Sequence, residues 1–234
     1  VFESLFNIPA CIMYNTMAEK RLVNRIFKNE SIYSEIAGTW VDIPDNLPEL
    51  DIKAKMKINC DYILYVGRID DFKITKQDFE WVLKYLQKIK KKIKFVLVGN
   101  SYIQIPASEH IMHLGFVDKI TKFNLIKQSV FLFQPSRFES LSMVLLEAFS
   151  MGKPVLVHQD CEVMKDHIDQ SQGGYYYNDY AGFEYAFDQL AGNESLNKSL
   201  GRSGKMYIGK NYSSEKIIAR FQHVIENRIS KPDN

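Results

Sequence analysis

The chain has 234 residues, of which 46% are hydrophobic and 25% charged. This length and apolar content are enough to bury one large core, alone or with a smaller attached segment. A net charge of +2 is too close to neutral to favour nucleic acid as a partner. No apolar run approaches the roughly 18 residues of a membrane-spanning helix, and no secretory signal is visible at the N-terminus. Three cysteines without metal-ligand spacing favour reduced thiols, so a cytoplasmic location is predicted.

The first sixty residues show little of the regular pattern that follows them. Residues 11–15 predict a short strand, and residues 17–27 predict an amphipathic helix for which Thr16 is a suitable N-terminal cap. Residues 42–48 contain two prolines and are predicted to be a linker.

From residue 60 onwards, strand and helix patterns alternate almost without interruption. The predicted strands are 61–66, 94–99, 111–114, 130–133, 154–157 and 174–177. The predicted helices are 77–91, 119–128, 142–151, 180–190, 194–208 and 213–229. Continuous apolar strands separated by helices indicate an α/β fold with a Rossmann-like, doubly wound, mainly parallel sheet. Ligands bind such sheets at the carboxyl ends of the strands.

The most informative stretch for function is the junction between the strand at 130–133 and the apolar helix that ends near Gly152. Glu139 is expected at the mouth of this helix, and Glu147 lies one to two turns inside it. A helix start attracts anions such as phosphate, because its first N–H groups are free and its dipole end is positive. Carboxylates beside it can accept hydrogen bonds from sugar hydroxyls. The junction therefore favours a nucleotide-sugar as ligand.

The two glutamates, followed by Ala-x-x-x-Gly-x-Pro-Val, resemble the donor-site signature of retaining GT-B glycosyltransferases of the group 1 (family 4) type. This family includes glycogen and sucrose synthases and many bacterial capsule and lipopolysaccharide sugar transferases. Three upstream stretches resemble further family motifs in the same order: YILYVGRIDDFK (62–73), KFVLVGN (94–100) and HLGFV (113–117). All of these motifs fall at predicted strand ends, where a ligand is expected on geometric grounds.

The resemblance implies a domain organisation and an activity. Residues 49–234 would form the donor-binding, C-terminal half of a GT-B fold, preceded by a linker and the tail of the acceptor domain in 1–48, with most of the acceptor domain absent. The protein would transfer a hexose-type sugar from a nucleotide-diphosphate sugar, with retention of configuration, to a carbohydrate or lipid-linked acceptor. Polysaccharide or glycolipid assembly of the bacterial type is the expected setting.

The resemblance also assigns roles to individual residues. Glu147 corresponds to the glutamate that holds the ribose hydroxyls, and Glu139 to the one that faces the transferred sugar. Arg68 and Lys73 correspond to the cations that clamp the diphosphate, where positive charge is needed as it departs. Lys76 competes with Lys73 for this role, because Ile74 stands where the family usually has glycine.

Backbone contacts to the donor are implied at three further places. The helix start would meet the phosphates and sugar. Ser142 could also be simply the N-cap residue of this helix, and both roles can hold together. The loop at 115–117 would lie along the base. The residues concerned are Gly67, Ser140, Leu141, Ser142, Met143, Gly115, Phe116 and Val117.

No cofactor and no metal are expected, because the cations and the helix dipole can neutralise the diphosphate. The five histidines show no metal-ligand spacing, and Asp70-Asp71 lies outside the fold context of metal-dependent transferases. The basic run at residues 88–94 is predicted to be a solvated face, with contact to anionic lipid at the inner face of the membrane as an alternative.

Three other interpretations share parts of this pattern. A GT-B nucleotide-sugar epimerase would have the same fold but a different set of acid and base residues. A non-catalytic nucleotide-sugar-binding subunit would require a separate acceptor-domain chain. A plain dinucleotide-binding domain is disfavoured, because no Gly-x-Gly-x-x-Gly follows the first strand of the repeat.

Overall fold

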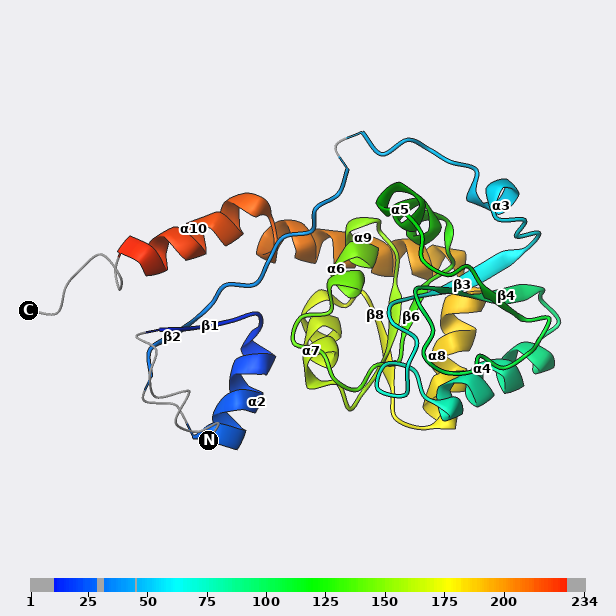
Figure 1. Cartoon of the computed structure of the whole chain (residues 1–234), viewed down its shortest axis with the longest axis horizontal. Coiled ribbons are helices and arrows are strands. Elements are labelled where there is room, and N and C mark those ends of the chain that lie inside the picture. The colour runs from blue at the N-terminus through cyan, green and yellow to red at the C-terminus, as the bar shows by residue number, and fades with distance from the viewer. Residues whose placement is uncertain (1–10, 29–31, 45, 227–234) are drawn as a thin grey trace, which may run out of the picture. The chain divides into compact units, whose positions relative to one another are not determined.

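The computed structural model describes residues 11–28, 32–44 and 46–226. The chain forms two compact units (Figure 1): one from residues 1–41 and 209–234, the other from residues 42–208. The assignment of 1–48 and 49–234 to two domains comes from the family resemblance and stays a prediction.

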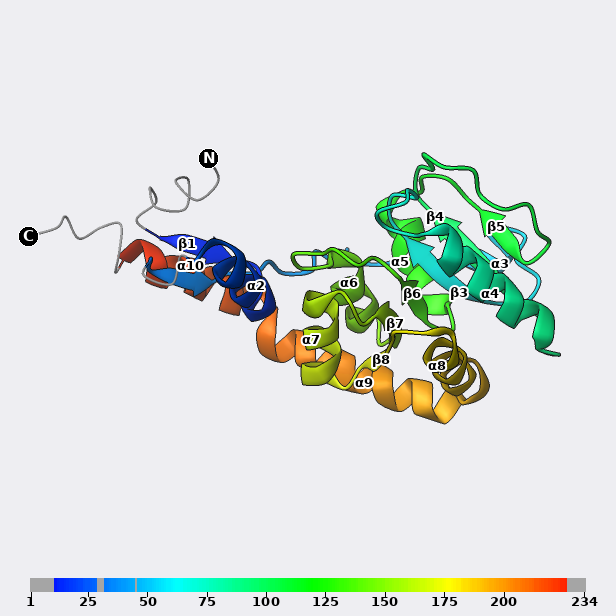
Figure 2. The same ribbon diagram turned by 90° about the horizontal axis from the view of Figure 1, so that it is seen from below.

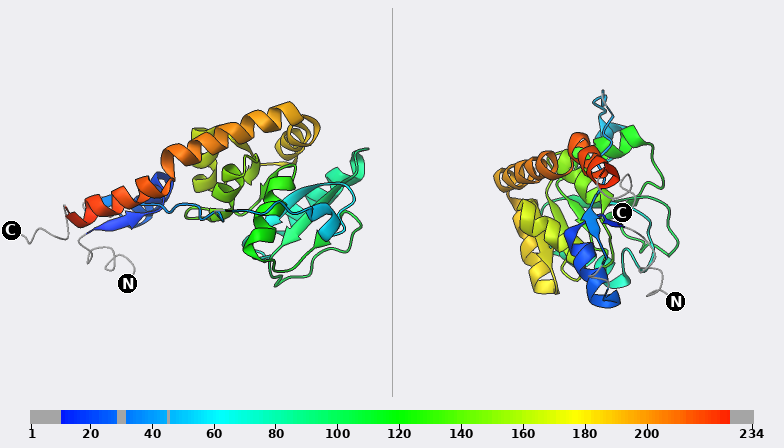
Figure 3. Two further views of the ribbon diagram at one scale, coloured as in Figure 1. Left: turned by 90° about the horizontal axis from the view of Figure 1, so that it is seen from above. Right: turned by 90° about the vertical axis from the view of Figure 1, so that its left-hand side faces the viewer.

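The smaller unit contains a parallel pair of short strands, β1 (Ile12–Tyr14) and β2 (Ser34–Ile36). Helix α2 (Met17–Phe27) begins as predicted at Thr16, whose hydroxyl accepts a hydrogen bond from Glu19 N over 3.0 Å. Helix α10 (Ser214–Val224) lies alongside these elements in Figure 3, and Arg220 Nη1 donates to Ala37 O over 3.2 Å. The strand within 11–15 and the helix at 17–27 are thus confirmed, whereas β2 was not predicted.

The larger unit is built on a six-stranded sheet in the order β5-β4-β3-β6-β7-β8, and every pairing in it is parallel. Its strands are β3 (Asp61–Val66), β4 (Ile93–Val98), β5 (Ile111–His113), β6 (Leu132–Gln134), β7 (Val155–His158) and β8 (Gly174–Tyr177). Its helices are α3 (Ile52–Lys55), α4 (Lys76–Lys88), α5 (Lys119–Gln128), α6 (Met143–Ser150), α7 (Glu162–Ser171), α8 (Tyr180–Gly192) and α9 (Glu194–Asn211), whose last turn belongs to the smaller unit. The predicted Rossmann-like fold class is confirmed.

Helices cover both faces of this sheet. Helices α4 and α8 lie beside each other on one face (Figures 1 and 2), where their apolar side chains enclose a core with alternate residues of the strands. Aromatic rings fill much of it, with Phe133 stacked on Tyr177 at 6.0 Å between ring centroids and Phe183 against both. On the other face, α6 packs on β6 and β7, and the Tyr62 hydroxyl donates to Leu125 O of α5 over 2.7 Å.

The predicted boundaries are correct for several elements and shifted by one to three residues for most others. The predicted strand at 130–133 is in fact Leu132–Gln134, and the helix at 213–229 is described from Ser214 to Val224. Two helices were missed. Helix α3 is capped by Asp51, which accepts from Ala54 N over 3.0 Å, but its single turn is too short to show a helical period. Helix α7 follows Cys161, which provides no side-chain cap, so its start gives no clear signal. In the part of the chain that the structure describes, no helix has the length and apolarity needed to span a membrane.

Candidate functional site

Strands β3 and β4 end side by side, and a glycine follows each of them. Gly67 N donates to Val98 O over 2.9 Å, and Gly99 has a φ of +129°. A Cβ atom placed on Gly99 would lie 2.0 Å from Gly67 O. Only glycine fits at position 99, because any side chain would collide with this carbonyl group. The backbone of Gly67 and Gly99 therefore carries no side chain at the carboxyl edge of the sheet.

A pocket of about 310 Å³ opens directly above these two glycines. Gly99 N donates to Gly115 O over 2.8 Å, which brings the predicted base loop to this edge. Two exposed aromatic residues line the pocket: Phe116, with 79% of its surface exposed, and Tyr102. Its lining residues are Val66, Gly67, Arg68, Val98, Gly99, Asn100, Tyr102, Phe116, Val117 and Lys122. Aromatic rings beside glycine backbone that carries no side chain suit a flat heterocycle.

Lys73 and Glu139, predicted to contact the diphosphate and the transferred sugar respectively, form an ion pair. Lys73 Nζ lies 2.8 Å from Glu139 Oε1 and also donates to Phe138 O over 3.1 Å. The Asp70 carboxylate accepts from Lys73 N over 3.0 Å and so fixes the lysine loop. Lys76 instead lies on α4, 3.8 Å from Glu80 Oε1, with 88% of its side chain exposed. Lys73, not Lys76, is therefore the lysine that reaches Glu139.

Arg68 lies where two hollows meet. It lines the pocket above the glycines and a neighbouring pocket of about 480 Å³ formed with Asp70, Phe72 and Tyr102, among others. Its guanidinium pairs with the Asp70 carboxylate, and its backbone carbonyl accepts from the Tyr65 hydroxyl over 2.6 Å. The Arg68 side chain is thus held by Asp70 but remains more than half exposed to solvent.

The start of α6 has an unusual geometry. Ser142 occupies the N-cap position with φ +63°, and its side chain makes no cap hydrogen bond. Ser142 is thus the N-cap residue, as the alternative interpretation proposed, but its hydroxyl does not cap the helix. Among the described residues, Ser142 Oγ is buried and has no hydrogen-bond partner. A buried hydroxyl without a partner is costly, which points to a ligand group at this position.

His167 anchors the segment before α6 through Leu141, a contact that the sequence did not predict. Its Nε2 lies 3.0 Å from Leu141 O and its Nδ1 2.9 Å from the Tyr207 hydroxyl. Because a carbonyl can only accept, Nε2 carries the proton and Nδ1 accepts from the tyrosine. Burial lowers the pKa of His167 to about 4, so the ring is neutral at physiological pH. The histidine fixes Leu141 without adding charge to the site.

Asp78 is a second anchor that the sequence did not reveal. Its fully buried carboxylate accepts from Thr75 N over 2.8 Å, from Arg137 Nη1 over 3.3 Å and from the Tyr177 hydroxyl over 3.2 Å. Arg137 belongs to the loop that carries Glu139. The Thr75-x-x-Asp78 capping pattern is readable in the sequence, but its link to Arg137 is not.

Glu147 is buried within α6, and its partner is a residue outside the predicted set. Lys122 Nζ of α5 lies 2.6 Å from Glu147 Oε1, and the two side chains are 25% and 11% exposed. Lys122 also lines the pocket above the glycines. Lys122 therefore contacts Glu147, which is predicted to bind the ribose, and also lines the pocket that is predicted to bind the base.

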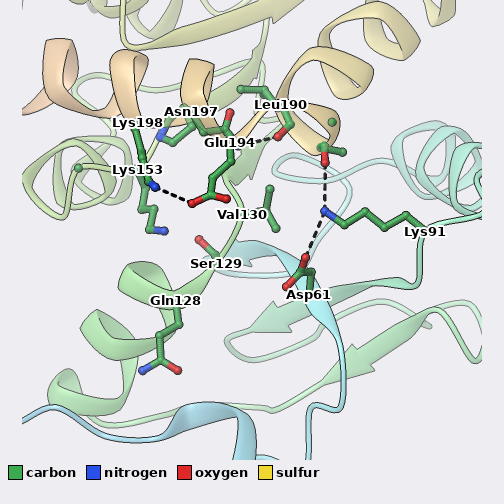
Figure 4. A pocket seen from close by; sticks show the side chains of 14 residues that line it. Asp61, Lys91, Gln128, Ser129, Val130, Lys153, Leu190, Glu194, Asn197 and Lys198 are labelled. Atoms are coloured by element: carbon green, nitrogen blue, oxygen red, sulfur yellow. Dashed lines mark hydrogen bonds and ion pairs between the residues drawn. The ribbon is translucent and has the colours of Figure 1, made fainter.

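A further hollow, of about 480 Å³, lies at the opposite edge, where the strands begin (Figure 4). Its charges largely pair with one another, since Lys91 Nζ lies 3.2 Å from Asp61 Oδ2 and Lys198 Nζ 2.6 Å from Glu194 Oε1. None of the predicted site residues lines it. The candidate site is consequently the carboxyl edge, where the predicted residues meet.

The sequence profile of the family described as "Glycosyl transferases group 1" matches residues 60–193, more than half of the chain. The chain belongs to this glycosyltransferase family. The match contains both glutamates, the two lysine partners and the glycine pocket. The fold is accordingly that of a GT-B glycosyltransferase, as the sequence motifs predicted.

Two curated relatives of this glycosyltransferase chain are themselves uncharacterized glycosyltransferases. One, from Methanocaldococcus jannaschii, is 30% identical over 152 residues, covering 64% of this chain and 41% of the relative. The other, from Haemophilus influenzae, is 24% identical over 223 residues, covering 90% of this chain and 59% of the relative. The chain thus spans about half the length of these relatives.

Solved structures share the fold at lower sequence identity. Sucrose-phosphate synthase from Thermosynechococcus elongatus aligns with a TM-score of 0.78 and 16% identity, over 98% of this chain and 61% of that one. An S. aureus TarM variant in complex with UDP and a sugar-glycerol aligns with a TM-score of 0.75 and 14% identity, over 96% of this chain and 45% of that one. At these identities, the similarities show only that the glycosyltransferase shares the fold of these proteins.

Proposed function

We propose that the carboxyl edge of the larger unit binds a nucleotide-diphosphate sugar, and that the protein transfers this sugar to an acceptor. The observation that carries the proposal is the convergence at one sheet edge of an aromatic-lined pocket, the Lys73–Glu139 pair and the buried Glu147. Relatives by fold support it, since solved structures include Anabaena HepE with UDP and glucose and an E. coli trehalose-6-phosphate protein with UDP-2-fluoro glucose.

The proposed roles follow from charge and position. The base lies against Phe116 in the pocket, and Glu147 accepts hydrogen bonds from the ribose. Arg68 and Lys73, together with the start of α6, hold the diphosphate and stabilise the negative charge that it gains on departure. Glu139 accepts hydrogen bonds from the transferred sugar. We expect no cofactor and no divalent metal, because these cations and the helix dipole supply the positive charge.

Transfer is proposed to proceed with retention of configuration, by a cytoplasmic enzyme of polysaccharide or glycolipid assembly. One relative by fold, trehalose-6-phosphate synthase, is described as a case of glycosyltransfer with retention. The acceptor would be a carbohydrate or a lipid-linked sugar. Because the chain spans only part of its relatives, we assign it the donor site, and transfer should be assayed with a longer protein.

Calorimetric titration of the chain with UDP, GDP and ADP in EDTA tests the donor site directly. We expect one nucleotide to bind, and Glu147→Ala to weaken it by about ten- to a hundredfold, as expected for losing a hydrogen bond to a charged group. Glu80→Ala, an exposed carboxylate on α4, is the matched control and should bind as the unmodified chain does. Absence of binding by all three nucleotides, or equal affinity in Glu147→Ala, would contradict the proposal. Binding only after Mg²⁺ is added would overturn its metal-free part.

A further inference from the structure

Lys122 differs from the other lysines of α5 in its surroundings. Lys119 and Lys127 pair with Asp42 and Glu49 and have about half of their side chains exposed. Lys122 is three-quarters buried and turned towards α6. Burying a cation is unfavourable unless a partner compensates it, so its position needs an explanation beyond solubility.

The start of α5 holds Lys122 in place. Asp118 caps the helix, accepting from Thr121 N over 2.8 Å and from the Thr121 hydroxyl over 2.6 Å. Lys122 follows one turn after the cap, and its neighbour Phe123 is fully buried. The ammonium group therefore comes from a rigid helix rather than from a loop.

The pair of Lys122 and Glu147 has unused hydrogen-bonding capacity. Among the described residues, Lys122 Nζ makes one hydrogen bond, to Glu147 Oε1, and Glu147 Oε2 makes none. An ammonium group has three N–H donors, and a carboxylate oxygen can accept two hydrogen bonds. Two donors and a free acceptor oxygen are thus left side by side, next to the pocket that Phe116 and Gly99 line.

We propose that Lys122 and Glu147 recognise the ribose diol of the donor as one unit, and that Lys122 makes the site select ribonucleotides over 2′-deoxyribonucleotides. Each ribose hydroxyl can both donate and accept. Glu147 accepts from one hydroxyl while Lys122 donates to the other, so neighbouring hydroxyls meet a neighbouring acceptor and donor. A 2′-deoxyribose would leave one of these buried groups without its partner. The inference rests on the proposed donor site.

The test compares the bound ribonucleoside diphosphate with its 2′-deoxy analogue by calorimetry. The unmodified chain should prefer the ribonucleotide by about tenfold, the effect of one lost hydrogen bond to a charged group. Lys122→Met keeps the length of the side chain but removes its donors, and should reduce this preference to less than about twofold. Lys122→Arg should restore most of it, and Lys119→Met, on the same helix, should retain it in full.

The outcomes separate this inference from the donor site itself. If the ribonucleotide binds and Glu147→Ala weakens it, but the 2′-deoxy analogue binds equally well, the role of Lys122 is wrong and the donor site stands. The same holds if Lys122→Met keeps the full preference. If no nucleotide binds, both fail. Thermal melting of each variant checks folding, and Lys122→Arg supplies the comparison if Lys122→Met does not fold.

Discussion

Among single residues, Lys73 connects two loops that follow different strands. Its ammonium group lies 2.8 Å from Glu139 Oε1 although 66 residues separate them in the chain. The side chain is about a quarter exposed, so it can reach a ligand without leaving its carboxylate. The pair therefore places a cation and a hydrogen-bond acceptor at the same point of the edge, as a diphosphate attached to a sugar requires.

Removing the Lys73 ammonium group should weaken binding of the phosphates and leave binding of the base unchanged. We expect Lys73→Met to weaken binding of the preferred nucleoside diphosphate by about ten- to a hundredfold, since a charge-assisted hydrogen bond is lost. Binding of the corresponding nucleoside should change little. Calorimetry with both ligands measures the difference, and Lys76→Met is the control, because Lys76 is three residues away and exposed. Equal losses for nucleoside and diphosphate, or for both lysine variants, would refute this role.

His167 makes the stability of the chain depend on pH. Its pKa is about 4 in the folded chain because of burial, against an ordinary value of 6.5. Between these values the unfolded chain binds the additional proton, so the free energy of unfolding falls as pH is lowered from 6.5 to 4. The full effect is roughly 3 kcal/mol.

Urea unfolding at several pH values measures this dependence. His167→Gln should flatten the curve between pH 6.5 and 4, because glutamine does not titrate and its amide can still donate to Leu141 O. Some slope will remain in every variant, because burial also lowers the pKa of His158. A curve unchanged by His167→Gln would exclude the histidine as its cause.

Which site residues can be predicted from the sequence depends on the range of their contacts. Glu139, Glu147, Arg68 and Lys73 stand out because their motifs are contiguous and lie at strand ends. Their supporting residues are found only in the folded chain, since the contacts join residues 25 to 59 positions apart: Lys122 to Glu147, His167 to Leu141 and Asp78 to Arg137. A buried partner of this kind leaves no local pattern.

At the scale of elements, the sheet was predictable because each of its strands is a short apolar run between turn residues. Helix α7 was missed because its sequence is largely polar and lacks a capping side chain. Its buried residues Val163, Met164, His167, Ile168 and Ser171 do follow helical spacing, and that period could have identified it. Strand β2 lies in a two-stranded sheet of three-residue strands, for which alternation gives too little signal.

The buried Ser142 hydroxyl at the start of α6 should promote nucleotide binding while lowering the stability of the fold. Ser142→Ala removes a buried hydroxyl that has no partner among the described residues, so the free energy of unfolding should rise by about 1 kcal/mol. Nucleotide affinity should fall in the same variant if the hydroxyl serves the ligand. Ser136→Ala is the matched control, because Ser136 Oγ donates to Phe138 O over 3.1 Å and its loss should destabilise the fold. Urea unfolding and calorimetry give both values, and a less stable Ser142→Ala would count against this interpretation.

For the whole molecule, the division into two units separates the candidate site from the chain ends. All the predicted site residues, and their partners Lys122, His167 and Asp78, lie within residues 42–208. That unit also contains the six-stranded sheet and the aromatic core. The smaller unit, by contrast, has only a two-stranded sheet, and sheets of this size are rarely stable without further packing.

A shortened chain of residues 42–211, which keeps α9 complete, should therefore fold and bind the nucleotide with unchanged affinity. The physical reason is that the core and the ligand contacts are both internal to the larger unit, so removing the rest deletes no group that touches the donor. Circular dichroism and calorimetry on both chains make the comparison, with Glu147→Ala in the shortened chain as the negative control. A shortened chain that folds but binds no nucleotide would show that the smaller unit supplies part of the donor site.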